Sequence, residues 1–520
     1  MKKPESPQEV KRKVKKSVFS FLFSRLTISG ILILLQFVFL LYVLLGLRGH
    51  LIYMYKALQI VSIVVLIWLI RKPDNPAYKI PWIILILLFA PLGALFYLLW
   101  GNTPFNRARL VKIHPIDTKQ IEAVQPSATR NLCTSLPRHR RNCQYLNNIA
   151  DMPAWKDTAA DFFPVGEYMF ASMLQELKKA KRFIFMEYFI IERGFMWDSI
   201  LEILQEKVQA GVDVRIMYDD VGCISTLPMG YHKKLQAMGI KVVRFNRFLP
   251  TLNTYLNYRD HRKICVIDGN VGYTGGINLA DEYINHVERF GHWKDTGVKL
   301  TGAGVANLTA LFLQLWDFSS NSNTSDLHDY LPTIKAPSDG FVQAFADSPL
   351  DNFNVSETVF LNIITNATHS VYITTPYLAL DNEMITALCT AAQSGIDVRI
   401  VTPGIPDKKT VYYVTRSYYA QLIHAGVRIY EYTPGFLHEK MIVADHDIAV
   451  VGTINMDFRS FYLHFECGTV FYRSSIVEKV RDDILDTIQH SEEIDEQWLK
   501  NYPWIKSIYA SLLSLLIPLM

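Results

Sequence analysis

Two short segments of the chain carry the same reactive side chains at the same spacing. Each begins with a histidine and a lysine two residues apart, continues with an aspartate and ends in a glycine-rich turn that carries an asparagine. The first contains His261, Lys263, Asp268 and Gly275-Gly276-Ile277-Asn278; the second contains His438, Lys440, Asp445 and Gly452-Thr453-Ile454-Asn455. Both follow the pattern H-x-K-x4-D-x6-G-[GT]-x-N. A repeat that keeps this spacing indicates one functional unit present twice.

These side chains suit chemistry on a phosphodiester. Residues two apart on a β-strand share a face, so each histidine should lie beside its lysine. If the two units pack about a pseudo-twofold axis, both pairs meet in one cleft. The lysines, together with Asn278, Asn455 and Thr453, could then bind the non-bridging oxygens, while one imidazole attacks phosphorus and the other protonates the leaving alcohol. The lysines supply the positive charge, so we expect no metal and no cofactor.

A nucleophilic histidine needs an acceptor at its second ring nitrogen, because that contact selects the tautomer that faces the substrate. Asp295 and Glu466 are the candidates for this histidine-orienting role. Asp268 and Asp445 complete the candidate catalytic motifs, but each lies five residues beyond its lysine. An odd spacing turns a side chain to the opposite face of a strand. We therefore interpret the two motif aspartates as structural residues that bond the backbone or loops.

The surrounding sequence repeats as well, and its pattern indicates the fold class. Residues 210–220 (AGVDVRIMYDD) reappear as 394–404 (SGIDVRIVTPG), and residues 235–245 reappear as 422–432. In each copy a helical pattern precedes a glycine and a β-branched run follows it, which is typical of α/β proteins. We predict an α/β fold in which N-terminal transmembrane helices precede two tandem, pseudo-twofold-related units, each a mixed sheet flanked by helices.

These patterns also give a domain organisation. The predicted parts are a membrane anchor at 1–105, a proline-punctuated linker at 106–160, a first unit at 161–335, a second unit at 336–490 and an apolar, amphipathic tail at 491–520. The tail could lie in a membrane interface or pack on the catalytic units.

Three apolar runs, 26–47, 51–70 and 80–100, form the predicted anchor. Each is about 20 residues long, which suffices for a helix to cross ~30 Å of hydrocarbon and exceeds the apolar region of a signal peptide. Pro91 and Gly93 interrupt the third run, which could be re-entrant, so we expect two or three crossings. The basic segment 1–25 favours a cytoplasmic N-terminus and contact with anionic membrane lipid. The side of the membrane that faces the remaining residues stays open.

The composition fits a membrane-bound protein and excludes other classes. Of 520 residues, 50% are hydrophobic and 20% are charged, which is more apolar than an average soluble domain. The net charge of +4 is too small to make nucleic acid the expected partner. The six cysteines show no metal-ligand spacing, so we expect core thiols, with Cys133 and Cys143 as the one plausible disulfide.

The paired motif resembles the signature of the phospholipase D superfamily, with Thr453 where serine is usual. Other segments resemble bacterial cardiolipin synthases, namely Met186-Glu187-Tyr188, Met217-Tyr218-Asp219-Asp220, Trp293-Lys294-Asp295, Thr375-Pro376-Tyr377 and Asn455-Met456-Asp457. The resemblance implies a multi-pass enzyme of the bacterial plasma membrane that converts two phosphatidylglycerol molecules into cardiolipin and glycerol. It also implies that His261 forms a phosphatidyl-enzyme and that His438 is general acid and then base, although the sequence itself leaves the two roles exchangeable.

Two alternatives can be set against this reading. A hydrolytic phospholipase D, a phosphatidylserine synthase or a nuclease would use the same scaffold. A nuclease should show a basic groove with interleaved aromatic residues, whereas the catalytic region here is close to charge-balanced. A catalytically inactive membrane scaffold should have lost a histidine or a lysine, and both pairs are intact.

Overall fold

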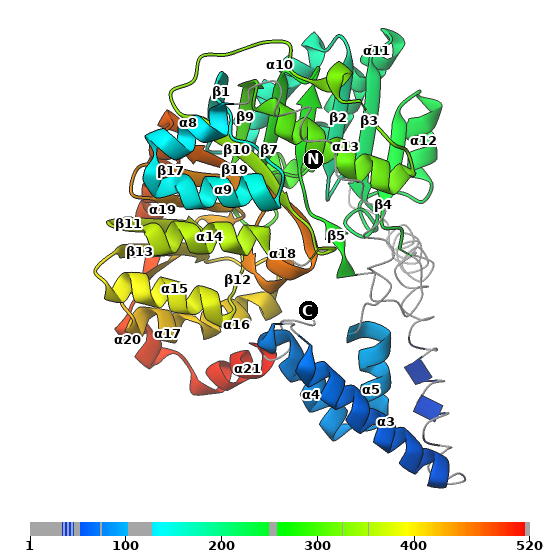
Figure 1. The fold of residues 1–520 in the computed structure, drawn as a ribbon, viewed down its shortest axis with the longest axis vertical. Helices are drawn as coiled ribbons and strands as arrows, with labels where there is room; N and C mark the ends of the chain where they lie inside the picture. Colours follow the sequence, from blue (N-terminus) through cyan, green and yellow to red (C-terminus); the bar gives the residue numbers. More distant parts are fainter. Residues whose placement is uncertain are drawn as a thin grey trace, which may run out of the picture. The chain divides into compact units, whose positions relative to one another are not determined.

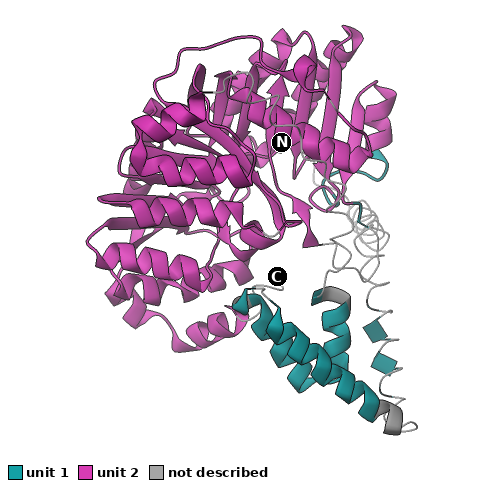
Figure 2. Ribbon diagram, viewed as in Figure 1, with its two compact units in different colours: residues 1–103, 224–231, 247–256 teal, residues 104–223, 232–246, 257–520 magenta. Residues whose placement is uncertain are grey.

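The computed structural model describes residues 34, 37, 38, 41, 42, 45, 52–72, 75–101, 127–248, 257–324, 326–351 and 353–514. The chain divides into two compact units, which Figure 2 distinguishes by colour. The first comprises 1–103, 224–231 and 247–256, and the second comprises 104–223, 232–246 and 257–520.

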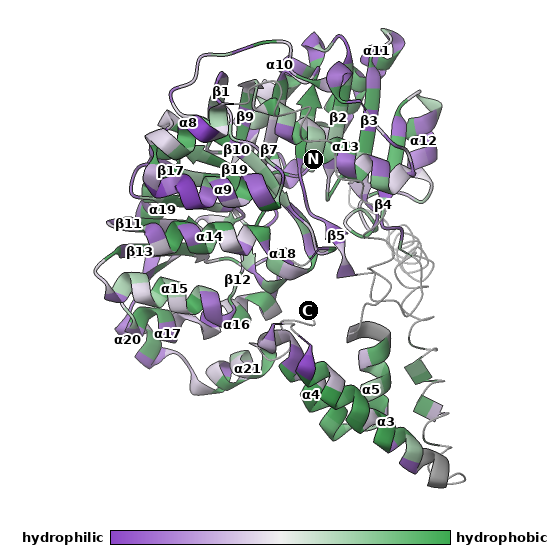
Figure 3. Cartoon of the chain, in the orientation of Figure 1, coloured by the Kyte–Doolittle hydropathy of each residue, from purple (hydrophilic) through white to green (hydrophobic). Residues whose placement is uncertain are grey.

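The first unit is largely helical in the described part of residues 1–103, and its residues 224–230 form turns. It contains α3 (Ile52–Arg71), α4 (Pro76–Leu88), α5 (Leu92–Phe96) and a π-helical turn, Tyr97–Gly101. Figure 3 shows that α3 and α4 are largely hydrophobic. The rings of Trp68 and Trp82 pack edge-on against Tyr97, with centroids 6.0 and 5.6 Å away. Aromatic and aliphatic packing therefore organises this unit.

The structure agrees with the three predicted apolar runs to different extents. Run 51–70 corresponds to α3, while run 80–100 is broken between α4 and α5, as the proline and glycine predicted. Most of run 26–47 lies outside the described residues. Across the described part of the chain, no helix has both the length and the apolarity that a membrane crossing requires.

The second unit contains two sheets with the same strand order (Figure 1). The first runs β1-β9-β7-β6-β2-β3-β4, and its strands are Thr158–Phe163, Gly297–Gly302, Val271–Gly275, Ile264–Ile267, Phe183–Tyr188, Asp213–Asp219 and Lys241–Phe245. Strands β2, β3 and β4 are parallel to one another, and the other pairs are antiparallel. The sheet is thus mixed, as predicted.

The second sheet repeats this arrangement strand for strand. Its order is β10-β19-β17-β16-β11-β13-β14-β20, and the strands are Phe341–Asp347, His464–Tyr472, Ile448–Gly452, Met441–Ala444, Ser370–Thr374, Asp397–Pro403, Arg428–Tyr432 and Ser491–Ile494. Strands β11, β13 and β14 are the parallel set. The duplication predicted from sequence is confirmed, and β20 adds one antiparallel strand from the predicted tail.

Helices cover both sheets. Those of the first half are α10 (Gly166–Lys179), α11 (Phe195–Gln209), α12 (Tyr231–Ala237) and α13 (Val305–Ser320). Those of the second half are α14 (Val355–Asn366), α15 (Asn382–Gln393), α16 (Lys409–Ser417), α17 (Tyr419–His424), α18 (Phe458–Tyr462) and α19 (Ser475–Gln489). The predicted helix–glycine–strand turns are present, with positive φ at Gly211 (+85°) and Gly395 (+88°). Glycine adopts this conformation without a Cβ clash.

The stretch predicted to be a proline-punctuated linker contains helices, and so does the tail that was predicted to be amphipathic. The proline-punctuated stretch holds α8 (Ala128–Ser135) and α9 (Arg140–Ile149), and the tail holds α20 (Glu496–Asn501) and α21 (Trp504–Ser514). Figure 1 shows α9, α14 and α15 side by side along one flank. Helix α9 buries Cys143 and Leu146 there. Apolar packing thus overrides the polar composition from which a loop was predicted, and all six cysteines are free thiols.

Candidate active site

The two halves exchange short strands immediately before their histidines. Strand β5 (Arg259–Asp260) pairs with β19 of the second half, and β15 (Gly435–Leu437) pairs with β8 (His292–Lys294) of the first half. The exchange continues into the motifs, because the His261 amide donates to Phe465 O (3.0 Å) and the His438 amide donates to Lys294 O (2.7 Å). Each histidine is therefore fixed to a strand of the opposite half.

This exchange brings each imidazole to a carboxylate of the other half. His261 Nδ1 lies 3.0 Å from both carboxylate oxygens of Glu466, the residue after Phe465. His438 Nδ1 lies 2.6 Å from Oδ2 of Asp295, the residue after Lys294. All four side chains are buried. The predicted orienting residues therefore contact the Nδ1 atoms, which leaves both Nε2 atoms to face a substrate.

Further groups hold each carboxylate in place. Glu466 accepts hydrogen bonds from the hydroxyls of Thr453 and Ser460, the latter at 2.8 Å. Asp295 accepts from the backbone amide of Thr296 at 2.9 Å. A Cβ at Gly276 would lie 2.0 Å from Asp295 Oδ1, so only glycine fits at this motif position. The second residue of each G-[GT]-x-N turn thus contacts the carboxylate of its own half.

The structure gives Thr453, which was predicted to bind a substrate phosphate, partners within the protein. Its side chain is completely buried, its hydroxyl donates to Glu466, and it accepts from the Cys467 amide at 3.0 Å. A hydroxyl has one proton to donate, and this proton is already used. Thr453 therefore positions Glu466 and, through it, His261.

The motif lysines lie directly beside the histidines. Lys263 Nζ donates to His261 O (2.5 Å), Lys440 Nζ donates to His438 O, and both lysines are almost fully buried. Burial lowers the pKa of Lys263 to about 8 and that of Lys440 to about 7, against the opposing attraction of Glu466 and Asp295. The site therefore holds cations that a phosphate would stabilise.

Electrostatics favour the neutral form of both imidazoles. Burial lowers the pKa of His261 and of His438 well below the usual value, and the charges of Lys263 and Lys440 lower both further. Burial also raises the pKa of Asp295 to about 7, although the Lys440 charge opposes this shift. A neutral imidazole can act as a nucleophile, and an anionic substrate would favour protonation of its partner.

The two motif asparagines lie at the site but are partly engaged. Asn278 accepts from the Ile190 amide (3.0 Å) and donates to the Tyr283 hydroxyl (2.8 Å), which leaves it one N–H. Asn455 is buried, and its Oδ1 has no hydrogen-bond partner among the described residues. One amide N–H from Asn278 is thus available to a phosphate oxygen.

The motif aspartates lie at the far ends of strands β6 and β16, away from the histidines. Asp268 accepts from the backbone amides of Lys181, Arg182 and Phe183 at 2.7–3.0 Å. Asp445 accepts equivalent bonds from 368–370 at 2.6–2.9 Å. Both bond the backbone, as predicted, but they lie in turns beyond the strands with φ of 56° and 50°, so strand alternation does not set their direction. These contacts anchor the starts of β2 and β11.

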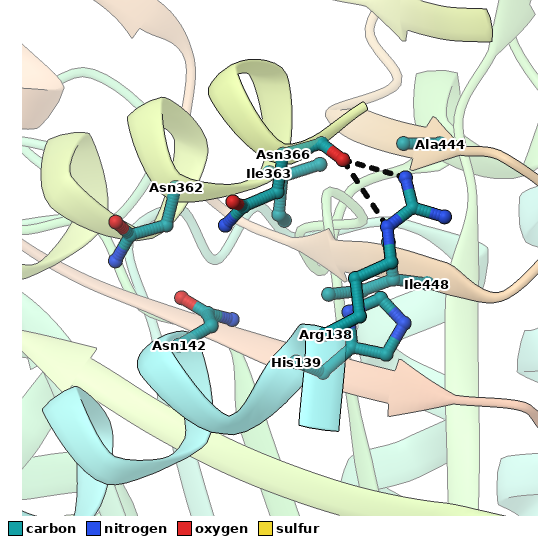
Figure 4. A pocket seen from close by; sticks show the side chains of 8 residues that line it. All are labelled: Arg138, His139, Asn142, Asn362, Ile363, Asn366, Ala444 and Ile448. Atoms are coloured by element: carbon teal, nitrogen blue, oxygen red, sulfur yellow. Dashed lines mark hydrogen bonds between the residues drawn. The ribbon is translucent and has the colours of Figure 1, made fainter. Parts of the chain in front are cut away.

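A residue from the predicted linker reinforces the second of these anchors. Arg138 donates to the Asn366 carbonyl at 3.2 and 2.6 Å, as Figure 4 shows, and forms an ion pair with Asp445. His139 Nε2 lies 3.0 Å from Asp447 Oδ2. The linker therefore stabilises the turn that follows β16.

The middle residue of each H-x-K motif takes part in a buried ion pair on the opposite strand face. Arg262 Nε lies 2.6 Å from Glu187 Oε1. Glu439 lies 2.8 Å from Lys294 Nζ, which also contacts Asp483 at 2.8 Å. Because Lys294 precedes Asp295, the second network also fixes the carboxylate that faces His438.

Sequence reasoning missed His464. Its ring centroid lies 5.6 Å from that of His261, and its Nδ1 lies 3.7 Å from Glu466 Oε1. Burial lowers its pKa to about 4, so the ring is neutral. The donor atoms of His261, His464 and Glu466 lie within 4.8 Å of one another and could hold a metal ion. The available signal was the spacing of two between His464 and Glu466 on one strand, which places both on the same face.

Aromatic rings form the remaining walls. Phe189 lies 5.1 Å from the His261 ring, and Tyr283, Trp293 and Phe436 lie 5.4–5.7 Å from the His438 ring. Such rings limit the access of water and increase the strength of the charge interactions within the site.

Comparisons with known proteins agree with this geometry. A family model described as "Cardiolipin synthase, PLD-like domain" matches residues 173–316 and 360–487, and one described as "Phospholipase_D-nuclease N-terminal" matches 60–102. An uncharacterised protein of Streptococcus mutans is 42% identical over 87% of this chain and 99% of its own length. A cardiolipin synthase of Geobacillus kaustophilus is 36% identical over 91% of this chain and 95% of its own length.

A comparison with solved structures shows a similar fold. The crystal structure of a phosphatidylserine synthase from Haemophilus influenzae superposes with a TM-score of 0.54 at 15% identity, over 73% of this chain and 99% of that chain. At this identity the likeness supports the α/β architecture alone.

Proposed function

Because the chain belongs to the cardiolipin synthase family of phospholipase D-like proteins, we propose that its paired histidines transfer a phosphatidyl group between two phosphatidylglycerol molecules. The chain is an enzyme, a phosphatidyltransferase, and its activity is cardiolipin synthesis. The observation that carries the proposed mechanism is the reciprocal pairing of His261 with Glu466 and of His438 with Asp295 across the two halves.

In the first proposed step, His261 Nε2 attacks the phosphorus of the donor lipid. The N–P bond forms, the bond from phosphorus to the glycerol headgroup oxygen breaks, and His438 gives its proton to that oxygen. Lys263, Lys440 and Asn278 stabilise the non-bridging oxygens as phosphorus becomes five-coordinate. Glycerol then leaves, and a phosphohistidine remains.

In the second step, a hydroxyl of another phosphatidylglycerol attacks the phosphohistidine. His438 accepts the hydroxyl proton, the new O–P bond forms and the N–P bond breaks, which yields cardiolipin and free His261. Every step is the reverse of one in the first half-reaction, so the overall transfer is reversible. Water in place of the second lipid would give phosphatidic acid.

The assignment of the nucleophile rests on the two carboxylates. Two hydroxyls and the His261 imidazole hold Glu466 in a fixed position, which suits a nucleophile whose orientation must not change. Burial raises the pKa of Asp295 to about 7, which suits a partner for the histidine that repeatedly gains and loses a proton.

We further propose that the enzyme acts at the bacterial plasma membrane as a multi-pass protein, with the domain boundaries predicted above. In α3, Ile60, Ile63 and Ile67 are more than half exposed. On α21, Trp504, Ile505, Ile508, Tyr509 and Leu512 form an exposed apolar stripe. Exposed apolar surface of this kind supports contact with lipid, and the basic N-terminus supports a preference for anionic lipid.

Lipid mass spectrometry tests the proposal directly. Purified full-length protein is incubated with phosphatidylglycerol vesicles, and cardiolipin, glycerol and phosphatidic acid are quantified, with His261→Ala and His438→Ala as controls. Equimolar cardiolipin and glycerol that appear only with the unmutated protein support the mechanism. Phosphatidic acid without cardiolipin refutes the choice of acceptor, and cardiolipin from His261→Ala refutes the assigned nucleophile.

A further inference from the structure

Lys408 is an exposed lysine at the start of α16, outside the paired motifs. Its Nζ lies 5.3 Å from the ring centroid of Tyr377, and it forms no ion pair with any residue that the structure describes. The neighbouring carboxylate of Asp407 accepts a hydrogen bond from the Tyr377 hydroxyl at 2.6 Å. The Lys408 ammonium group is therefore held over an aromatic ring and is free to meet an anion.

A chain of rings connects this lysine to the catalytic histidine of the second motif. Tyr377 lies 6.5 Å from Phe436, and Phe436 lies 5.7 Å from His438, centroid to centroid. Lys408 thus stands at the edge of the site.

A side-chain hydrogen bond and a strand pair fix α16 in this position. Thr415 of α16 accepts a hydrogen bond from the Leu378 amide at 3.1 Å. Strand β12 (Leu378–Ala379) pairs with β18 (Met456–Asp457), which directly follows the motif residue Asn455. The helix that carries Lys408 is therefore attached to the same strand pair as the second motif.

The chemistry of the reaction calls for a second anion subsite. Phosphatidylglycerol as acceptor brings a phosphodiester that does not react and that remains in the product, three carbons away from the attacking hydroxyl. The buried lysines 263 and 440 serve the reacting phosphate. Two other buried cations of this region, Arg262 and Lys294, already pair with carboxylates. An exposed cation at the edge of the site could therefore meet the unreacting phosphate.

We propose that Lys408 binds the phosphate of the acceptor phosphatidylglycerol and so selects an anionic lipid over water and neutral alcohols. The assignment rests on the proposed function. It predicts that Lys408 affects the choice of acceptor and leaves formation of the phosphatidyl-enzyme unchanged, because the donor phosphate lies at the buried lysines.

A competition experiment separates the two half-reactions. Full-length protein in phosphatidylglycerol vesicles is supplied with ethanol, an acceptor that has no phosphate, and cardiolipin, phosphatidylethanol, phosphatidic acid and glycerol are measured. Lys408→Gln should lower the ratio of cardiolipin to phosphatidylethanol about fivefold, the upper range for an exposed ion pair, while glycerol release stays the same. Lys408→Arg should restore the ratio, and Lys409→Gln, an exposed neighbour, should leave it unchanged.

Other outcomes overturn the assignment. An unchanged ratio of cardiolipin to phosphatidylethanol in Lys408→Gln shows that the residue does not affect the choice of acceptor. An equal loss of cardiolipin and phosphatidylethanol places Lys408 at the donor phosphate instead. If the unmutated protein forms phosphatidylethanol and glycerol but no cardiolipin, the proposed function itself fails, and the assignment fails with it.

Discussion

Replacing Thr453 by valine distinguishes a positioning role from a phosphate-binding role. The substitution keeps the shape of the side chain and removes the hydroxyl that donates to Glu466, the carboxylate at His261 Nδ1. A hydrogen bond to a charged acceptor contributes about 1.5–3 kcal/mol. If this energy holds His261 in its reactive orientation, kcat should fall by about 10- to 150-fold, since each ~1.4 kcal/mol is tenfold in rate.

The assay measures cardiolipin formation in mixed vesicles over a range of phosphatidylglycerol surface fractions, so that kcat and KM are obtained separately. Thr453→Val should lower kcat and leave KM within about twofold, because the substrate contacts remain. Thr453→Ser should recover most of the rate, since it retains the donor. The melting temperature reports the separate cost of leaving the Cys467 amide without its acceptor.

A raised KM with an unchanged kcat would contradict this reasoning. Such a result would mean that the hydroxyl leaves Glu466 and binds the phosphate of the substrate. An unchanged rate in Thr453→Val would show that Ser460, the second hydroxyl at Glu466, is sufficient to hold the carboxylate.

Three further predictions follow from the same contacts. Asp268→Asn should lower the free energy of unfolding by about 2 kcal/mol, because an amide oxygen is a weaker acceptor for three backbone amides. The rate per folded molecule should change less than threefold, with the folded fraction measured by thermal unfolding and circular dichroism. A hundredfold loss of this rate would mean that Asp268 belongs to the catalytic group. Glu466→Gln should reduce kcat at least about 100-fold, since it removes the charge at His261; near-normal turnover would rule out the orienting role. Burial lowers the pKa of Lys440 to about 7 and that of Lys263 to about 8, so both lysines lose their protons well below pH 10. The value of kcat/KM should therefore fall as pH rises from 7 to 9. A pH profile of kcat/KM that stays flat to pH 10 would contradict this prediction.

The sequence predicted the parts of the site that follow from local spacing. The H-x-K repeat identified both histidines and lysines, and the prediction that Asp268 and Asp445 bond the backbone agrees with their contacts, although they lie beyond the strands to which alternation applies. The helix–glycine–strand repeats around Gly211 and Gly395 identified the duplicated α/β fold. Such inferences succeed because strand periodicity is a backbone property that tertiary context does not change.

Features that depend on long-range pairing could not be predicted in the same way. Asp295 and Glu466 were recognisable as candidates, but their exchange between halves depends on the pairing of β5 with β19 and of β15 with β8. The contact of Thr453 with Glu466 was not foreseen, because a hydroxyl beside a phosphate-binding motif resembles a phosphate ligand until its buried partner is known. The helices α8 and α9 were missed because they pack against each other and α9 packs against α14, which lies more than 200 residues away.

The exchanged strands give a physical reason why the motif occurs twice in one chain. A half-molecule would contain a histidine without its carboxylate and a carboxylate without its histidine, because Glu466 serves His261 and Asp295 serves His438. Removing one partner of a buried, charge-assisted pair leaves the other unsatisfied at a cost of about 1–3 kcal/mol or more. The buried Lys294 network adds to this dependence, since a lysine of the first half contacts Glu439 and Asp483 of the second. Catalysis and the association of the two halves therefore depend on the same hydrogen bonds, and the active site can form only when both halves are folded together.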